Sequence, residues 1–123
     1  MARLGLLDDR ARPRVLPVTY VLHEQAVWTA IDNKPKASGR EPARVGWLRE
    51  RPGAALTVDH YEDDWSRLCW LQLLGTVTVL DGPPAAPLLD ALAGRYPQYR
   101  DDPPPGPLLR LEPERALWWR AAG

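Results

Sequence analysis

A basic segment in the middle of the chain is the first place where residue types and spacing predict binding chemistry. Residues 32–52 hold six lysines and arginines against three acidic residues, whereas the whole chain has 16 basic and 16 acidic residues and a net charge of zero. Arginine, lysine and hydroxyl side chains bind phosphates and carboxylates. Pro42 favours a helix start, whose free N–H groups also attract anions. The segment is predicted either to bind an anion or to form a solvated basic surface.

The stretch VDHYEDDWSRL combines acidic residues with a histidine, an aromatic residue and an arginine. His60 is of the residue type that changes charge near neutral pH, and the alternative is a hydrogen-bonded strand histidine. Trp65 is expected either to pack in the core or to stack against a planar ligand. The neighbours Asp63 and Asp64 have poor geometry for an acid–base pair. We expect them to form a turn and to pair with Arg67.

Several kinds of active site have no counterpart in the sequence. His23, His60 and Cys69 fall on separate predicted strands without metal-ligand spacing, so no metal site is predicted. No glycine-rich phosphate loop and no GxSxG motif are present. Cys69 is the only cysteine, which excludes an intramolecular disulfide, and it is predicted to be a buried, inert thiol.

Length and composition predict one folded domain over residues 1–123. A hydrophobic fraction of 45% is typical of a chain with a packed core. The first apolar run, Leu4–Leu7, is too short for a signal peptide, and no run approaches the roughly 20 residues of a membrane helix. The zero net charge gives no basic footprint for nucleic acid. We therefore expect a cytoplasmic protein that binds neither nucleic acid nor a membrane.

Short strands separated by turns dominate the predicted secondary structure, because β-branched and aromatic residues cluster between turn formers. Strands are predicted at Ala2–Leu7, Arg14–Leu22, Ala26–Ile31, Ala54–Tyr61, Leu68–Leu80, Leu108–Leu111 and Ala116–Trp119. Helices are predicted at Glu41–Arg51 and Ala85–Arg95, and a proline-rich loop at Tyr96–Pro107. The pattern predicts a mainly β, α+β fold, a small antiparallel barrel with about two short helices.

Local residues refine this arrangement. The first three strands are expected to form an antiparallel meander, with a turn at residues 23–25. Pro17 cannot donate to a strand ladder, so its strand is predicted to be at an edge or bulged. Gly75 predicts a bulge or bend. The segments 108–111 and 116–119 are expected to make one last strand or a hairpin around residues 112–114. Trp118 and Trp119 are expected to seal the core or a dimer interface.

Three groups of residues resemble a known family in order and spacing. They are Pro17–Tyr20 with Val27–Lys36, then Val58–Leu68, and finally Arg95–Tyr99 with Pro103–Pro107. Together they resemble the actinobacterial deazaflavin (F420)-dependent oxidoreductases of the pyridoxamine-phosphate-oxidase-like, FMN-binding split-barrel class. The resemblance covers nearly the whole chain. Similar proteins begin with a helix before the first strand, whereas this chain starts almost at that strand.

The resemblance implies a split β-barrel that forms a homodimer, with each cofactor in a groove between the two barrels. It implies cofactor phosphate binding near the third strand and the loop after it. Thr29, Lys34 and Lys36 match those positions, and Ser38 and Arg40 follow in the same loop.

The second group adds further candidates for cofactor binding. These are His60, Trp65 and Arg67. The function implied is hydride transfer between F420 and a small conjugated or heteroaromatic substrate. Because the cofactor carries the chemistry, no catalytic side chain is named.

Three alternatives remain open. The same fold could use FMN, which needs no site for a carboxylate tail. A repurposed barrel could bind or convert a small molecule without a redox cofactor. A third alternative is haem bound through His60 or His23.

Overall fold

The computed structural model describes residues 1–31 and 41–122. Within these residues, seven antiparallel strands form one sheet in the order β2-β1-β5-β6-β7-β4-β3. The strands are β1 (Ala2–Leu7), β2 (Pro13–Val18), β3 (Val21–His23), β4 (Ala26–Ala30), β5 (Gly53–His60), β6 (Cys69–Leu80) and β7 (Leu108–Arg120). The helices are α1 (Ala43–Glu50), α2 (Ala86–Arg95) and α3 (Gln98–Asp101), with a 3-10 turn η1 (Trp65–Arg67). The predicted mainly β fold with short helices is confirmed.

The two edges of the sheet are consecutive in the chain, and this closes the barrel. β2 pairs with β1 and β3 pairs with β4, so the short link between β2 and β3 runs from one edge of the sheet to the other. The predicted single strand Arg14–Leu22 is therefore wrong, since it is divided into β2 and β3, whereas both antiparallel pairings of the predicted meander are present. Pro17 does lie in an edge strand, as its missing N–H group requires. The predicted turn before β4 is confirmed, with positive φ at Glu24 and Gln25.

Two tyrosines, one directly after α2 and one in α3, bind the link between β2 and β3. The backbone N–H of Tyr20 donates to the Tyr96 hydroxyl at 3.0 Å. The Thr19 hydroxyl bonds the Tyr99 hydroxyl at 2.9 Å. β2 and β3 do not pair with each other, so this link has no backbone ladder. The tyrosine hydroxyls provide hydrogen bonds there instead, which matters because buried backbone groups need partners. The segment predicted as a loop thus contains α3, which helps to position these tyrosines.

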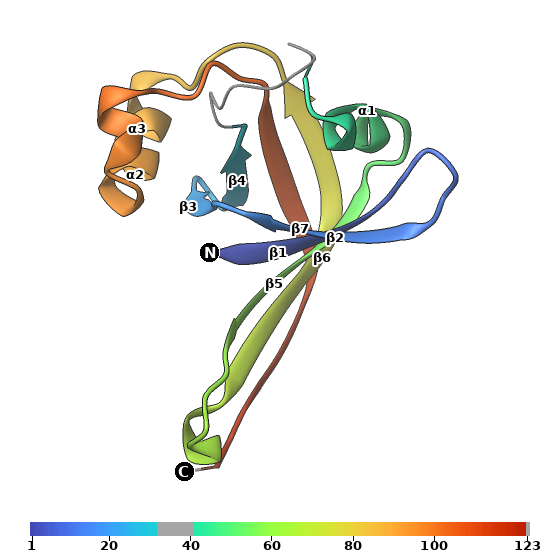
Figure 1. Cartoon of the computed structure of the whole chain (residues 1–123), viewed down its shortest axis with the longest axis vertical. Helices are drawn as coiled ribbons and strands as arrows, with labels where there is room; N and C mark the ends of the chain where they lie inside the picture. The colour runs from blue at the N-terminus through green and yellow to red at the C-terminus, as the bar shows by residue number, and fades with distance from the viewer. Residues whose placement is uncertain (32–40, 123) are drawn as a thin grey trace.

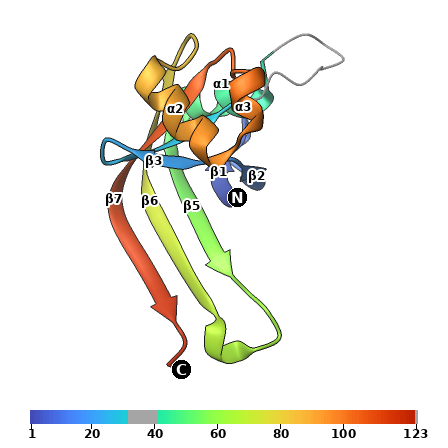
Figure 2. The ribbon, with the colours of Figure 1, turned by 90° about the vertical axis from the view of Figure 1, so that its left-hand side faces the viewer.

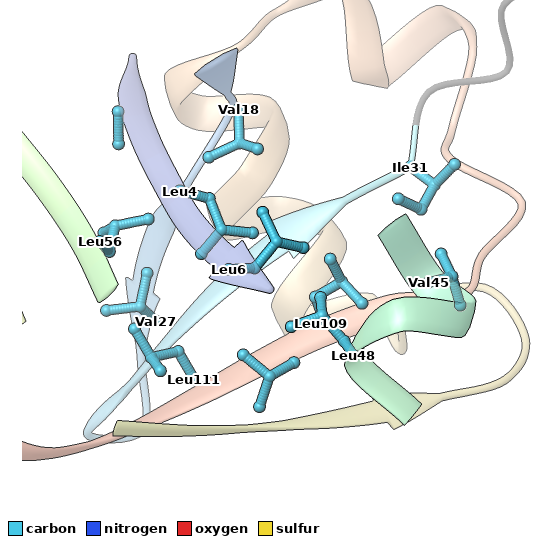
Figure 3. Close-up of a cluster of buried hydrophobic side chains, with 12 residues drawn as sticks. Leu4, Leu6, Val18, Val27, Ile31, Val45, Leu48, Leu56, Leu109 and Leu111 are labelled. Atoms are coloured by element: carbon cyan, nitrogen blue, oxygen red, sulfur yellow. The ribbon is translucent and has the colours of Figure 1, made fainter. Parts of the chain in front are cut away.

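The core fills the barrel with aliphatic side chains from β1, β4, β5 and β7 (Figure 3). Leu4 and Leu56 are almost fully buried, as strand alternation requires of one face of a sheet. Val45 and Leu48 of α1 cover one end of this core. A second cluster joins α2 and α3 to the outside of the barrel through Leu92 and its neighbours.

β7 is one long strand, so the expected last strand is confirmed and its alternative, a hairpin at residues 112–114, is wrong. Gly75 pairs with Pro113 and Leu74 pairs with Arg115, which leaves Glu114 as an extra residue in a bulge. The predicted irregularity at Gly75 is therefore confirmed. A side chain at Gly75 would collide with the Glu112 carbonyl group, so glycine is required where the strands approach this closely.

Three strands continue beyond the barrel and form an arm that ends near the C-terminus (Figures 1 and 2). β1 pairs with β5 only at residues 55–57, and β4 pairs with β7 only at residues 108–111. Beyond these pairs, the remaining ends of β5, β6 and β7 pair only with one another. We call residues 58–60, 69–71 and 118–120, with their connection 61–68, the arm.

Candidate functional site

The inner face of the arm continues the apolar face that lines the barrel. Leu56 is buried in the core, and Val58 and His60 lie on the same face because side chains alternate along a strand. Across the three strands, Val58 pairs with Leu71 and Leu71 with Trp118. The indole of Trp118 is 70% exposed. The arm therefore presents apolar side chains that no element of the described chain covers.

An apolar groove lies between this face and the mouth of the barrel. Its volume is about 400 Å³. Tyr20, Leu22 and Val27 line it from the barrel, and Leu71, Leu73 and Trp118 line it from the arm side. The volume is within the range of small-molecule sites, roughly 300–1,000 Å³. We call this cavity the arm groove.

A more polar cavity of about 670 Å³ lies at the end of the arm. Ser66, Arg67 and Arg120 line it, together with Cys69 and Trp118. Cys69, Trp118 and Arg120 line both cavities, so the two cavities are neighbours. We call the second cavity the tip pocket.

A capped 3-10 turn positions the residues of the tip pocket. The Asp64 carboxylate accepts from the Ser66 N–H at 3.1 Å and from the Ser66 hydroxyl at 2.7 Å. These two hydrogen bonds, first the one from the hydroxyl, lower the pKa of Asp64 because they favour its charged form. Asp64 thus acts as the cap of η1, which confirms its predicted role as a turn former.

His60, Glu62 and Arg67 form a chain of polar contacts. The Nε2 atom of His60 contacts Oε2 of Glu62, and Nε of Arg67 lies 3.5 Å from Oε1 of the same carboxylate. The interpretation of His60 as a hydrogen-bonded strand histidine is confirmed. The expected partner of Arg67 was Asp63 or Asp64, but Glu62 takes that place because the carboxylate of Asp64 caps η1.

Exposure excludes the core alternative for three tryptophans. The Trp65 side chain is 78% exposed, so it does not pack in the core. Trp118 and Trp119 also lie in the arm rather than in the core, because β7 runs past the barrel. Cys69 is partly exposed and lines both cavities, so the predicted burial of its thiol is wrong.

Thr29 lies at the other end of β7 from the arm. It pairs with Leu109, near the start of β7, whereas Arg120 ends that strand. It is 3% exposed, and its Oγ1 atom has no hydrogen-bond partner within residues 1–31 and 41–122. One chain therefore does not bring Thr29 next to the arm. The other phosphate-binding candidates, Lys34, Lys36, Ser38 and Arg40, lie outside the described residues.

Two arginines of the basic segment make structural contacts. The Arg49 guanidinium donates to Asp81 at 2.9 Å, and this bond raises the pKa of Arg49. Arg51 donates to the Asp8 carbonyl at 3.3 Å. These contacts link α1 and the residue that follows it to the segments after β6 and β1, so both arginines have a structural role.

Arg120 is a candidate that sequence reasoning missed. It lies directly across from Cys69, which in turn faces His60. The missed signal was the two-residue alternation of Trp118 and Arg120, which predicts one face for both. The open choice between one last strand and a hairpin at residues 112–114 left this register undetermined.

Two negative findings apply to the described part of the chain. Residues 1–31 and 41–122 contain no group of three or more histidine, cysteine or acidic side chains that could hold a metal ion. No helix in these residues is long and apolar enough to cross a membrane.

No protein-family model and no curated protein sequence matches this chain. Solved structures do resemble it. The haem storage protein HutZ from Vibrio cholerae aligns over 97% of this chain and 84% of its own, with a TM-score of 0.73 and 14% identity. A FAD-binding protein from Mesorhizobium loti aligns over 95% and 81%, with a TM-score of 0.66 and 17% identity.

An F420 reductase aligns over 94% of this chain and 87% of its own, with a TM-score of 0.65 and 16% identity. The chain has the split-barrel fold. Identities this low show the fold alone, because one fold carries many functions. The predicted fold class is confirmed. The structural neighbours of this chain include a FAD-binding protein, an F420 reductase and a haem storage protein.

Proposed function

We propose that this split-barrel protein is an oxidoreductase that uses the deazaflavin F420 to exchange a hydride with a small conjugated or heteroaromatic substrate. The observation that carries the proposal is the arm, where His60 and Arg67 meet through Glu62 beside an apolar groove. These residues belong to the stretch that most resembles F420-dependent enzymes. An apolar wall with a polar end suits a planar cofactor that must react away from water.

The chain offers residues that fit such a cofactor. The buried, unpartnered Thr29 hydroxyl precedes Lys34, Lys36, Ser38 and Arg40, and together they would hold the phosphate. The arm's His60 and Arg67 would contact the ring system, with Trp65 stacking on it. When bound, a deazaflavin supplies the hydride chemistry, and the protein orients it and excludes water.

The same geometry favours a homodimer. Thr29 and the arm lie at opposite ends of β7 in one chain, so a complete cofactor site requires the arm of a second copy. The exposed Trp119 would lie in that interface, on the face of the arm opposite to Trp118 and the arm groove. The net charge of zero does not oppose self-association.

An absorbance and fluorescence titration tests the cofactor assignment. Purified protein is titrated in parallel with oxidised and reduced F420, with FMN and with haem. The double variant Lys34→Ala, Lys36→Ala is expected to lose several kcal/mol of F420 binding at most, because charged hydrogen bonds contribute about 1.5–3 kcal/mol each. A control variant, Arg10→Ala with Arg115→Ala, removes two exposed charges elsewhere and is expected to bind normally. Unchanged binding in the lysine variant would reject the phosphate site.

The titration also separates the alternatives. FMN binding without F420 binding would favour a flavin enzyme of the same fold. A Soret band would show haem binding, and its loss in His60→Ala would identify His60 as the haem ligand. His60 is a suitable ligand because its side chain is half exposed. Binding of none of the three would leave a barrel that acts without a redox cofactor.

A further inference from the structure

The arm groove and the tip pocket are neighbouring cavities with shared lining residues, and together they make an amphipathic site. Leu71, Leu73 and Val58 make its inner part apolar. Arg67 and Arg120 make its outer part basic. Trp118 belongs to both parts and offers an exposed ring at their junction. A ligand that fills both parts needs an apolar body and a polar end.

The charged residues at the tip pocket predict the sign of the charge on that polar end and the number of charges it carries. Arg120 has no ion pair or hydrogen bond to any side chain within residues 1–31 and 41–122. Arg67 is already engaged by Glu62, whose carboxylate also contacts His60. One guanidinium group therefore remains for a ligand. A guanidinium binds one carboxylate through two parallel hydrogen bonds, whereas a doubly charged phosphate would face the nearby Glu62 with too little compensation.

We propose that this site binds an aromatic monocarboxylate, with its ring in the arm groove against Trp118 and its carboxylate on Arg120. The inference rests on the proposed function, because it names the class of substrate that the cofactor would meet. A groove of about 400 Å³ accommodates one or two rings with a short side chain. Stacking on Trp118 selects aromatic bodies over aliphatic ones.

Calorimetric titration of the cofactor-free protein tests this site. The probes are 4-phenylbutyrate and its neutral analogue 4-phenylbutanamide, which share the body and differ in charge. We expect the wild-type protein to bind the acid at least about tenfold more tightly than the amide, as one charged hydrogen-bonded pair implies. In Arg120→Gln that preference should fall to about twofold or less, with the affinity for the amide unchanged.

A matched control uses the same strand. Arg115 lies on β7 but on the opposite face of the sheet from Arg120, because it is an odd number of residues away. Arg115→Gln is expected to keep the full preference for the acid. Leu71→Ser should weaken the acid and the amide equally, because both place the same ring in the groove. Thermal unfolding of each variant shows whether it is folded.

Three results would overturn the inference: no binding of the acid at millimolar concentration, equal binding of acid and amide, or an unchanged preference in Arg120→Gln. The cofactor titration separates this inference from the proposed function. Cofactor binding without acid binding would reject only the aromatic monocarboxylate. Acid binding without binding of any cofactor would support the ligand site and reject the redox role.

Discussion

Substitution of Thr29 by valine should stabilise the ligand-free protein and weaken cofactor binding. Thr29 faces the barrel interior together with Val27 and Ile31, and it is 3% exposed. Its Oγ1 atom has no hydrogen-bond partner in the described part of the chain. A buried hydroxyl without a partner costs about 1–3 kcal/mol, and valine replaces it with a methyl group of the same shape. We expect a gain of about 1 kcal/mol in the free energy of unfolding.

Urea denaturation followed by tryptophan fluorescence measures this gain, which corresponds to a rise in Tm of roughly 4 °C for a chain of this size. Thr19→Val is the matched control. Its hydroxyl bonds the Tyr99 hydroxyl at 2.9 Å, so the same substitution should destabilise by about 1 kcal/mol. In the cofactor titration, Thr29→Val should lose about tenfold in affinity. A loss of stability in Thr29→Val would refute the reasoning, since it would mean that the hydroxyl already has a partner in the ligand-free protein.

Three further predictions concern the barrel, its acid stability and its assembly. Gly75→Ala should lower the free energy of unfolding measured in urea by about 2 kcal/mol or more, because its Cβ would collide with the Glu112 carbonyl group. Gly46→Ala in α1 meets no neighbour and should raise that free energy by about 0.5–1 kcal/mol. Equal effects of the two substitutions would contradict the close approach of the strands at the bulge. Hydrogen bonds, first from the Arg12 N–H, lower the pKa of Asp8 from 3.8 to about 2, so its stabilising effect is present above about pH 4 and is lost as the pH falls towards 2. The stability difference between the wild-type protein and Asp8→Asn should therefore shrink between about pH 5 and pH 2.5 in urea titrations, and a constant difference would reject this role. Light scattering should show a dimer that is weakened in Trp119→Ser but not in a Trp65→Ser control, and a monomeric wild-type protein would exclude the shared site.

Local sequence predicted most of the elements correctly. Ala2–Leu7 matches β1 residue for residue, and α2 begins one residue after its predicted start. Period-two and helical patterns are local properties, so these segments could be recognised from short windows of sequence. Gly75 was recognised for the same reason, because glycine inside a strand pattern marks a bulge.

The errors came from contacts between distant segments. Arg14–Leu22 has a continuous strand composition, but its two halves pair with β1 and β4 on opposite edges of the sheet. Pro113 suggested a turn, but it lies in β7 beside the bulge that Gly75 makes possible in β6. The cap of η1 could not be assigned either, since Asp64 and Glu62 are equally good candidates for Arg67 until the turn places their carboxylates.

The sequence by itself determined the fold class, most element positions and the stretch that holds His60, Trp65 and Arg67, because these depend on residue type and short-range spacing. Only the tertiary structure decided which face of the arm is apolar, that Arg120 joins His60 across Cys69, and that Thr29 lies far from the arm. The physical reason is strand register. A shift of one residue moves every side chain to the other face of a sheet, and register is set by pairing between segments that are distant in the chain.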